Sequence, residues 1–172
     1  MTEAPAARGE VRFAVDVMLG RLARWLRILG HDVVYQPQLR GRALARAARR
    51  EGRWLLTRDT RLLRERDLPP HLLVASDRFR EQLRQVAAAV PLGGARPLSR
   101  CLDCNRPLEP VSREAVRERV PPHVWATQEA FLRCPRCGKC YWEATHRRRM
   151  LAELAALGLA PGAHDDHGRR GA

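Results

Sequence analysis

Two pairs of cysteines in the C-terminal third of the chain have the spacing of metal ligands. Cys101 and Cys104 form the first C-x2-C pair, and Cys134 and Cys137 form the second. Together they supply the four thiolates that Zn²⁺ prefers in structural sites. Four sulfur ligands leave no open position for a substrate, so the predicted zinc ion is structural and any catalysis takes place elsewhere in the chain.

A fifth cysteine, Cys140, creates a rival pair with Cys137. We prefer the pairing of Cys134 with Cys137 because Pro135 and Gly138 shape the turn around it, and glycine readily adopts the left-handed backbone needed after the second ligand. A redox-active pair needs a thioredoxin-like context around one C-x2-C, and the presence of two pairs argues against it. The remaining alternative is a set of unrelated buried thiols.

Three aspartates form a second candidate site. Asp16, Asp59 and Asp77 each lie just past the C-terminal end of a predicted strand. Ligands bind at this edge of open parallel sheets, so we expect the three carboxylates to converge there. Converging carboxylates repel one another, and Mg²⁺ or Mn²⁺ relieves the repulsion through oxygen ligands. Such an ion polarises a phosphodiester and activates water, although any one aspartate, taken alone, is better explained as a helix N-cap.

Arginines near these acids are candidates for binding substrate phosphates. Arg21, Arg24 and Arg27 lie on the polar side of the first predicted helix, and Arg58 lies in the loop after the third strand. Guanidinium groups bind phosphate oxygens through paired hydrogen bonds. The alternative for the helix arginines is a solvated charged face, which makes Arg58 the better single candidate. His146, which precedes three arginines, is a weaker candidate for the same surface.

The charge of the chain favours a polyanionic partner. The 172 residues carry a formal net charge of +13, from 32 Lys and Arg against 19 Asp and Glu. Residues 1–100 contain 20 Arg and 10 acids, so most of the surplus belongs to this segment. Binding to nucleic acid would release condensed counterions. The alternative is a compositional bias toward arginine, because Lys139 is the only lysine.

Short apolar runs alternate with segments of helical periodicity in the first part of the chain. This alternation predicts an α/β fold, in which a parallel sheet carries helices on both faces. Asp32 precedes its strand, at the opposite edge from the three candidate acids, and is assigned to a turn. The predicted strands are residues 13–15, 33–35, 54–56 and 72–74, and the predicted helices are residues 19–29, 42–50, 62–63 and 78–89.

Changes in composition divide the chain into three parts. Residues 10–92 form the predicted α/β domain, residues 98–157 contain the cysteine module and a final helix, and residues 158–172 are expected to be a disordered tail. The chain has no apolar stretch long enough for a membrane span, and its N-terminus lacks the apolar core of a signal peptide. We therefore expect a cytoplasmic protein without a membrane partner, whose reduced thiols favour metal over disulfides.

Four motifs occur in order along the chain. They are Val-Asp-Val-Met-Leu-Gly-Arg-Leu-Ala-Arg-Trp-Leu-Arg at residues 15–27, Leu-Leu-Thr-Arg-Asp at residues 55–59, the two cysteine pairs, and Tyr-Trp-Glu-Ala-Thr-His at residues 141–146. Over residues 12–150 the chain thereby resembles the Mut-seven C-terminal RNase domain family. The resemblance implies a PIN-like nuclease domain, followed by a zinc ribbon, that cleaves RNA with Mg²⁺ or Mn²⁺. It also matches the three aspartates to the acidic positions of the PIN-like site.

The second predicted helix departs from the PIN-like pattern. PIN-like sites usually carry another acid near the start of this helix, but residues 39–44 contain none, and Glu51 lies at the far end. The leading hypothesis is a metal-dependent ribonuclease whose aspartates hold the metal and whose arginines position phosphates. One alternative is a non-catalytic RNA-binding module with a decayed acidic site, which the missing acid favours. Another is a protein-interaction adaptor that uses the zinc module.

Overall fold

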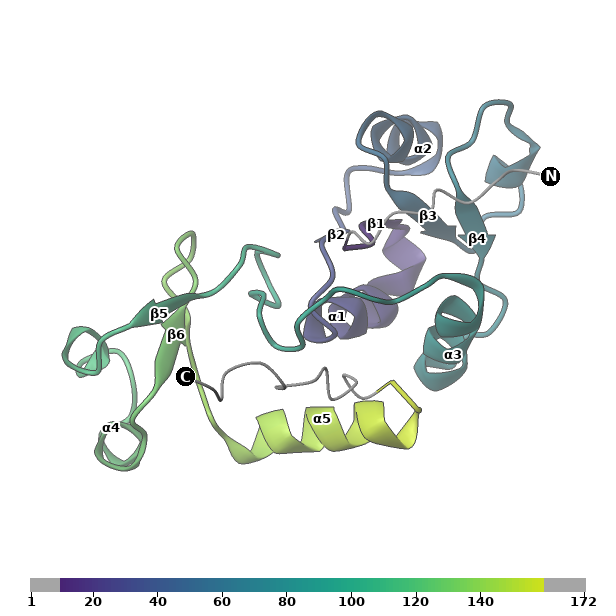
Figure 1. The fold of residues 1–172 in the computed structure, drawn as a ribbon. Helices are drawn as coiled ribbons and strands as arrows, with labels where there is room; N and C mark the ends of the chain where they lie inside the picture. Colours follow the sequence, from purple (N-terminus) through teal and green to yellow (C-terminus); the bar gives the residue numbers. More distant parts are fainter. Residues whose placement is uncertain (1–9, 160–172) are drawn as a thin grey trace, which may run out of the picture.

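A four-stranded parallel sheet forms the centre of the larger part of the molecule (Figure 1). The structure, a computed structural model, describes residues 10–159, so most of the tail predicted for residues 158–172 lies outside the described residues. The strands are β1 (Phe13–Val15), β2 (Val33–Val34), β3 (Trp54–Thr57) and β4 (His71–Leu73). Their order is β2-β1-β3-β4, and every neighbouring pair is parallel. The predicted α/β fold is confirmed.

The two central strands are buried on both faces, which explains why their sequences do not alternate between apolar and polar residues. Phe13, Ala14 and Val15 of β1 are each at most 1% exposed. The observed strands agree with the predicted ones to within a residue at each end. The fourth is displaced by one residue, although Val74 still donates its backbone N–H to the carbonyl of Thr57 at 2.8 Å.

Helices cover both faces of the sheet, as predicted (Figure 1). The helices of this part are α1 (Gly20–Ile28), α2 (Gly41–Arg50) and α3 (Phe79–Ala89), with the 3-10 turns η1 (Val17–Leu19) and η2 (Leu62–Arg64). Helices α1 and α3 pack together on one face, whereas α2 covers the other. None of the helices between residues 10 and 159 combines the length and the apolar character that crossing a membrane requires.

A second, antiparallel sheet carries the cysteine module. Its strands are β5 (Glu109–Val111), β6 (Phe131–Arg133) and β7 (Cys140–Trp142), in that order. Between the two cysteine pairs the chain forms η3 (Glu114–Val116) and α4 (Pro122–Thr127). This module has an apolar cluster of its own, which consists of Val116, Val120, Val124 and Phe131.

The final helix, α5 (Thr145–Ala156), runs from the small sheet back to the parallel-sheet part (Figure 1). Leu154 is fully buried in the same apolar cluster as Leu22 and Leu83. Arg80 of α3 donates two hydrogen bonds to the carboxylate of Glu153. The helix that composition groups with the cysteine module therefore completes the core of the α/β part.

The first cysteine pair is fastened to the edge strand β2. Asn105, the residue after this pair, accepts the N–H of Val33 at 3.0 Å, and Arg27 donates to the carbonyl of Val33 at 2.9 Å. Arg27 also donates to the carbonyls of Leu102 and Asp103, at 2.8 and 3.1 Å. Side chains thus satisfy backbone groups that an edge strand otherwise leaves unpaired.

Asp32 reinforces this contact from its position before β2. Its carboxylate accepts a hydrogen bond from the Asn105 amide at 2.7 Å and forms an ion pair with Arg53 at 2.9 Å. Burial opposes its ionisation, but these hydrogen bonds and the charge of Arg53 outweigh burial and lower the pKa of Asp32. Asp32 is therefore an anchor between the two parts of the molecule as well as the turn residue that the sequence predicts.

Because His31 is buried, we expect the folded state to be less stable in acid. The ring is 1% exposed, and its Nδ1 lies 3.0 Å from the carbonyl of Val11. Burial lowers the pKa of His31, although the hydrogen bond to Val11 opposes the shift. Below about pH 6.5 the unfolded chain therefore binds a proton that the folded chain excludes, so the free energy of unfolding falls by up to about 1.4 kcal/mol per pH unit.

Urea denaturation at a series of pH values between about 7.5 and 5.5, which spans the titration of an ordinary histidine, measures this slope. His31→Gln keeps a donor for the Val11 carbonyl and has no proton to exclude, so its profile should be flatter than that of the wild type. Parallel profiles for the two proteins would contradict this role of His31.

Candidate functional site

The four predicted metal ligands converge. The Sγ atoms of Cys101, Cys104, Cys134 and Cys137 all lie within 4.8 Å of one another. Between residues 10 and 159 this is the only set of three or more Cys, His, Asp or Glu side chains grouped so closely. Four thiolate donors at this spacing fit the tetrahedral sulfur shell of a structural zinc ion.

The two cysteine pairs are shaped by the same turn. Asn105 follows the first pair with φ of 61°, and Gly138 follows the second with φ of 72°. Each of these left-handed residues donates its N–H to the carbonyl of the first cysteine of its pair, at 2.9 Å for Cys101 and 3.0 Å for Cys134. Glycine was expected at this position, and asparagine is among the few other residues that enter the left-handed region readily.

Cys140 lies outside this group. It sits in β7, and its Sγ contacts the carbonyl of Gly138 at 3.6 Å. The next residue, Tyr141, points at the site instead and donates its hydroxyl to Cys101 Sγ at 3.2 Å. Sequence reasoning missed Tyr141, because nothing in its immediate neighbours shows which sulfur lies opposite.

The thiols differ in how readily they ionise. Burial opposes ionisation of Cys101, but hydrogen bonds from Tyr141 and from the backbone N–H groups of Cys104 and Asp103 lower its pKa to about 7. A hydrogen bond with Cys137, desolvation and the charge of Cys101 raise the pKa of Cys104 to about 12. The negative charge of the first thiolate opposes ionisation of the neighbouring thiols. Several adjacent thiolates therefore need a cation between them.

Asp16 is the most buried of the three candidate acids. It follows β1 directly and is 6% exposed. Its Oδ2 accepts the hydroxyl of Thr57 at 2.8 Å, and its Oδ1 accepts the N–H of Met18 at 3.3 Å. The second contact caps η1, so the capping role considered for a single aspartate is present here.

Asp59 is linked to Asp16 through one side chain. The N–H of Asp59 donates to Thr57 Oγ1 at 3.0 Å, and the same hydroxyl donates to Asp16. Asp59 Oδ1 accepts the N–H of Arg61 at 2.9 Å and thereby caps the turn before η2. The chain leaves β1 toward β2 on one side and leaves β3 toward β4 on the other, so these two acids lie where a doubly wound sheet binds ligands.

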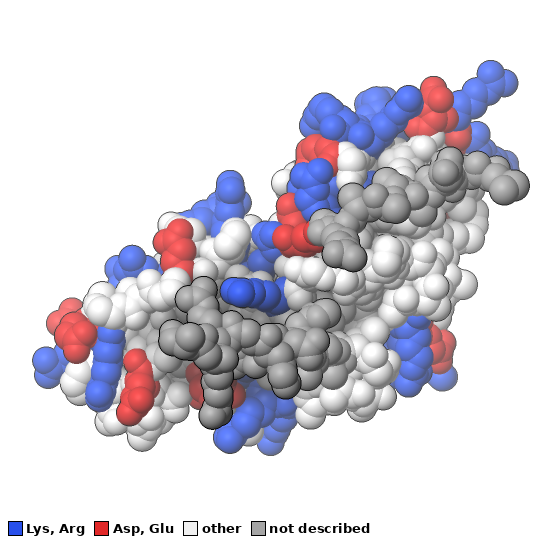
Figure 2. All heavy atoms as spheres, viewed as in Figure 1, with Lys and Arg blue, Asp and Glu red and all other residues white. Residues whose placement is uncertain are grey.

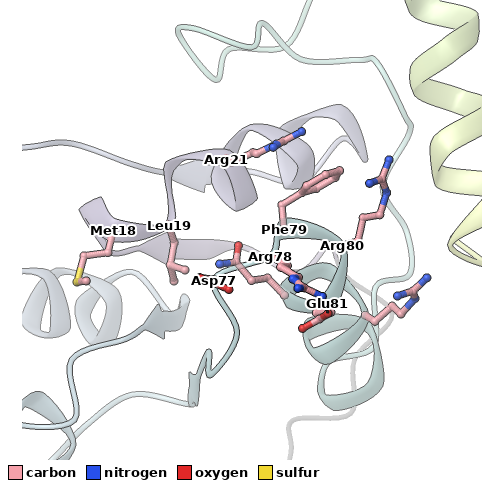
Figure 3. A pocket seen from close by; sticks show the side chains of 10 residues that line it. Met18, Leu19, Arg21, Asp77, Arg78, Phe79, Arg80 and Glu81 are labelled. Atoms are coloured by element: carbon pink, nitrogen blue, oxygen red, sulfur yellow. Dashed lines mark hydrogen bonds and ion pairs between the residues drawn. The ribbon is translucent and has the colours of Figure 1, made fainter.

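Asp77 lies at the same edge, between β4 and α3. It is exposed, and it lines an open pocket of about 600 Å³ together with Met18 and Arg21 (Figure 3). The guanidinium of Arg21 lies 3.9 Å from the ring centroid of Phe79, which itself stacks on Trp25. The pocket therefore combines a carboxylate with an arginine that lies over an aromatic ring.

The three candidate acids share one property that sets them apart. Residues 10–92 contain nine acids, and six of them form ion pairs with arginine: Glu10, Asp32, Glu51, Glu65, Asp67 and Glu81. In the described part of the chain, no ion pair joins an arginine or lysine to Asp16, Asp59 or Asp77. Their carboxylates are not grouped as tightly as the cysteine sulfurs, but among the described residues none of the three forms an ion pair, although the protein is strongly basic.

The four arginines predicted to bind phosphate do not lie together in the structure. Arg21 lines the pocket beside Asp77, and Arg58 is half-buried at the carboxyl edge. Arg24 is exposed and lies 4.0 Å from Asp103. Arg27 is only 8% exposed, and backbone carbonyls occupy its terminal nitrogens. Arg27 therefore fastens the first cysteine pair to the sheet, a role that its helical spacing does not reveal.

Metal analysis of single cysteine variants separates the two possible pairings. The purified protein should contain one zinc ion per chain, and Cys140→Ser should keep it because Cys140 lies outside the sulfur group. Cys134→Ser removes a buried ligand and should lose the metal and unfold at least the cysteine module. Loss of zinc from Cys140→Ser with retention in Cys134→Ser would instead favour the rival pair.

Comparison with known proteins gives one family. Residues 11–154 match the family model described as the Mut7-C RNAse domain. The match spans most of the chain and includes both the parallel sheet and the cysteine module. Searches of curated proteins and of solved structures give no match.

Proposed function

The chain belongs to the Mut7-C RNAse domain family, and we propose that it is a metal-dependent ribonuclease that hydrolyses RNA phosphodiesters at the carboxyl edge of the parallel sheet. The family supports a nuclease activity. The RNA substrate, the Mg²⁺ or Mn²⁺ ion and the assignment of Asp16, Asp59 and Asp77 as its ligands are parts of the proposal. In this proposal the four-cysteine site holds Zn²⁺ and has a structural role.

The lack of ion pairs at the three acids carries the proposal. Burying a carboxylate without a cation is costly, and buried charges in proteins are normally paired or bound to metal. Asp16 is buried with only a hydroxyl and a backbone N–H as partners. Arginines pair with the other acids of residues 10–92, so the lack of such pairs at Asp16, Asp59 and Asp77 leaves a place for a different cation.

The side chains have separate tasks in this proposal. Thr57 holds the carboxylate of Asp16 and the backbone of Asp59 at the ends of adjacent strands, and the N–H of Arg61 holds the carboxylate of Asp59. Asp77 supplies a third, exposed oxygen donor from the pocket wall. Arg21 and Arg58 bind the phosphate and keep its phosphorus in line with the attacking water. A bound Mg²⁺ or Mn²⁺ supplies Lewis acidity and a water of lowered pKa.

A second candidate is an RNA-binding module without catalysis. The first turn of α2 has no acid, so the carboxylate that PIN-like sites usually place there is missing. Two of the three remaining acids already accept backbone hydrogen bonds as caps, which reduces the oxygen atoms left for a metal. This candidate predicts salt-dependent RNA binding with no turnover.

A cleavage assay distinguishes the two candidates. With Mn²⁺ present, the wild type should cleave labelled single-stranded RNA, and Asp16→Asn should reduce the rate by about 100-fold or more, because the buried metal-binding charge is lost. Glu129→Gln is the matched control, because it removes an equal charge at an exposed position in the loop between α4 and β6.

Equal cleavage by the wild type and Asp16→Asn would remove Asp16 from the mechanism. RNA binding by the wild type without any cleavage, in Mg²⁺ or Mn²⁺, would favour the non-catalytic module.

A further inference from the structure

One face of α2 carries only arginines. Its exposed side chains include Arg42, Arg46 and Arg49, which we call the α2 arginine face, and the side chains of Arg42 and Arg49 are 72% and 60% exposed. An open groove of about 350 Å³ separates this face from residues 65–68. Figure 2 shows a group of basic side chains over the top of the molecule, where Figure 1 places α2.

The three arginines form one row along the helix. They follow one another at spacings of four and three residues, whereas Leu44 and Ala48 point into the core. With a rise of about 1.5 Å per residue, the row extends over roughly 10 Å. One strand of a nucleic acid duplex rises about 3.4 Å per phosphate, so the row spans about three phosphates.

The arginine in the first turn does not favour the helix itself, whereas Arg49 lies in the last turn, where a cation is favourable. Helix α2 has no acid in its first turn, and Arg42 lies there next to Arg40 at the N-cap. The positive end of the helix dipole disfavours cations at this position. An exposed helix that served only solubility would gain from mixed charges, so the arginines are better explained by a ligand.

Few acids compete for these arginines. Glu65 pairs with Arg42 at 2.7 Å, and Asp67 pairs with Arg49 at 3.6 Å. The ion pairs of the described residues include none for Arg46. Exposed ion pairs contribute little stability, so phosphate oxygens can replace the two carboxylates at small cost.

The groove also points toward the candidate active edge. Helix α2 follows β2 and therefore begins at the carboxyl edge of the sheet, where Asp16 lies. The opposite wall belongs to the segment that starts at Asp59 and continues through η2. Both walls of the groove thus belong to segments that leave this edge, and one of these segments begins at Asp59.

We propose that the α2 arginine face binds the phosphate backbone of an RNA strand and guides it to the edge at Asp59. This inference rests on RNA being the substrate in the proposed function, but it does not require cleavage. It places the strand on the opposite face of the sheet from the pocket lined by Arg21, and it assigns binding residues that the sequence motifs do not include.

Binding of a short labelled single-stranded RNA, measured without divalent cations, tests the inference apart from catalysis. The triple variant Arg42→Gln, Arg46→Gln, Arg49→Gln should lower the slope of log K against log salt by about 2, which corresponds to roughly 100-fold weaker binding at about 0.1 M salt. Its thermal stability should change little, because the dipole disfavours the cation removed from the first turn, Arg42, and favours the cation removed from the last turn, Arg49.

A matched triple variant, Arg117→Gln, Arg148→Gln, Arg149→Gln, removes the same charge from exposed positions elsewhere. It should weaken binding by less than about threefold, since nonspecific steering through the total charge is screened by salt. Equal weakening by both triple variants would show that only net charge matters and would overturn the inference. Displacement of the RNA by polyglutamate at equal charge concentration would assign the face to an acidic polypeptide and overturn it as well.

RNA binding that persists in Asp16→Asn but is lost in the α2 triple variant would support the inference even if the protein cleaves nothing. Failure of the binding inference and failure of the proposed nuclease activity are therefore separate outcomes.

Discussion

The hydrogen bond from the Thr57 hydroxyl to Asp16 joins the two central strands at the edge where ligands bind. Thr57 is fully buried, and its oxygen also accepts the backbone N–H of Asp59, so one hydroxyl links the carboxylate of Asp16 to the backbone of an acid 43 residues away in the sequence. A buried acid is costly unless it is satisfied. The Thr57 hydroxyl and the Met18 N–H give the Asp16 carboxylate hydrogen-bond partners but do not compensate its negative charge. The proposed metal site depends on this difference.

The cysteine module is joined to the parallel-sheet part by hydrogen bonds and by shared core residues. Its first cysteine pair ends in the turn at Asn105. Asn105 and Arg27 form hydrogen bonds with the backbone of the edge strand β2, and α5 contributes Leu154 to the main core. A metal ion that holds the four cysteines would therefore stabilise the edge of the parallel sheet as well as the small sheet. The family match likewise covers both parts of the chain.

Local patterns predicted most of the elements, because strands buried on both faces and amphipathic helices leave a clear periodicity. The spacing of the cysteines likewise predicted their grouping, since a C-x2-C turn allows few geometries. Roles that depend on contacts between distant segments were not predictable. Arg27 lies in a row of helix arginines, and only the fold shows that its partners are carbonyls about 75 residues away. The same is true of Tyr141 at Cys101 and of Leu154 in the core.

The central claim is that the unpaired acids at the carboxyl edge hold a divalent cation. Crystals of the zinc-loaded protein grown with Mn²⁺, with anomalous diffraction recorded on both sides of the manganese and zinc absorption edges, test it directly. The account predicts manganese bound to the carboxylate oxygens of Asp16 and zinc among the four cysteines. Zinc at the cysteines with no manganese at Asp16, Asp59 or Asp77 would contradict it.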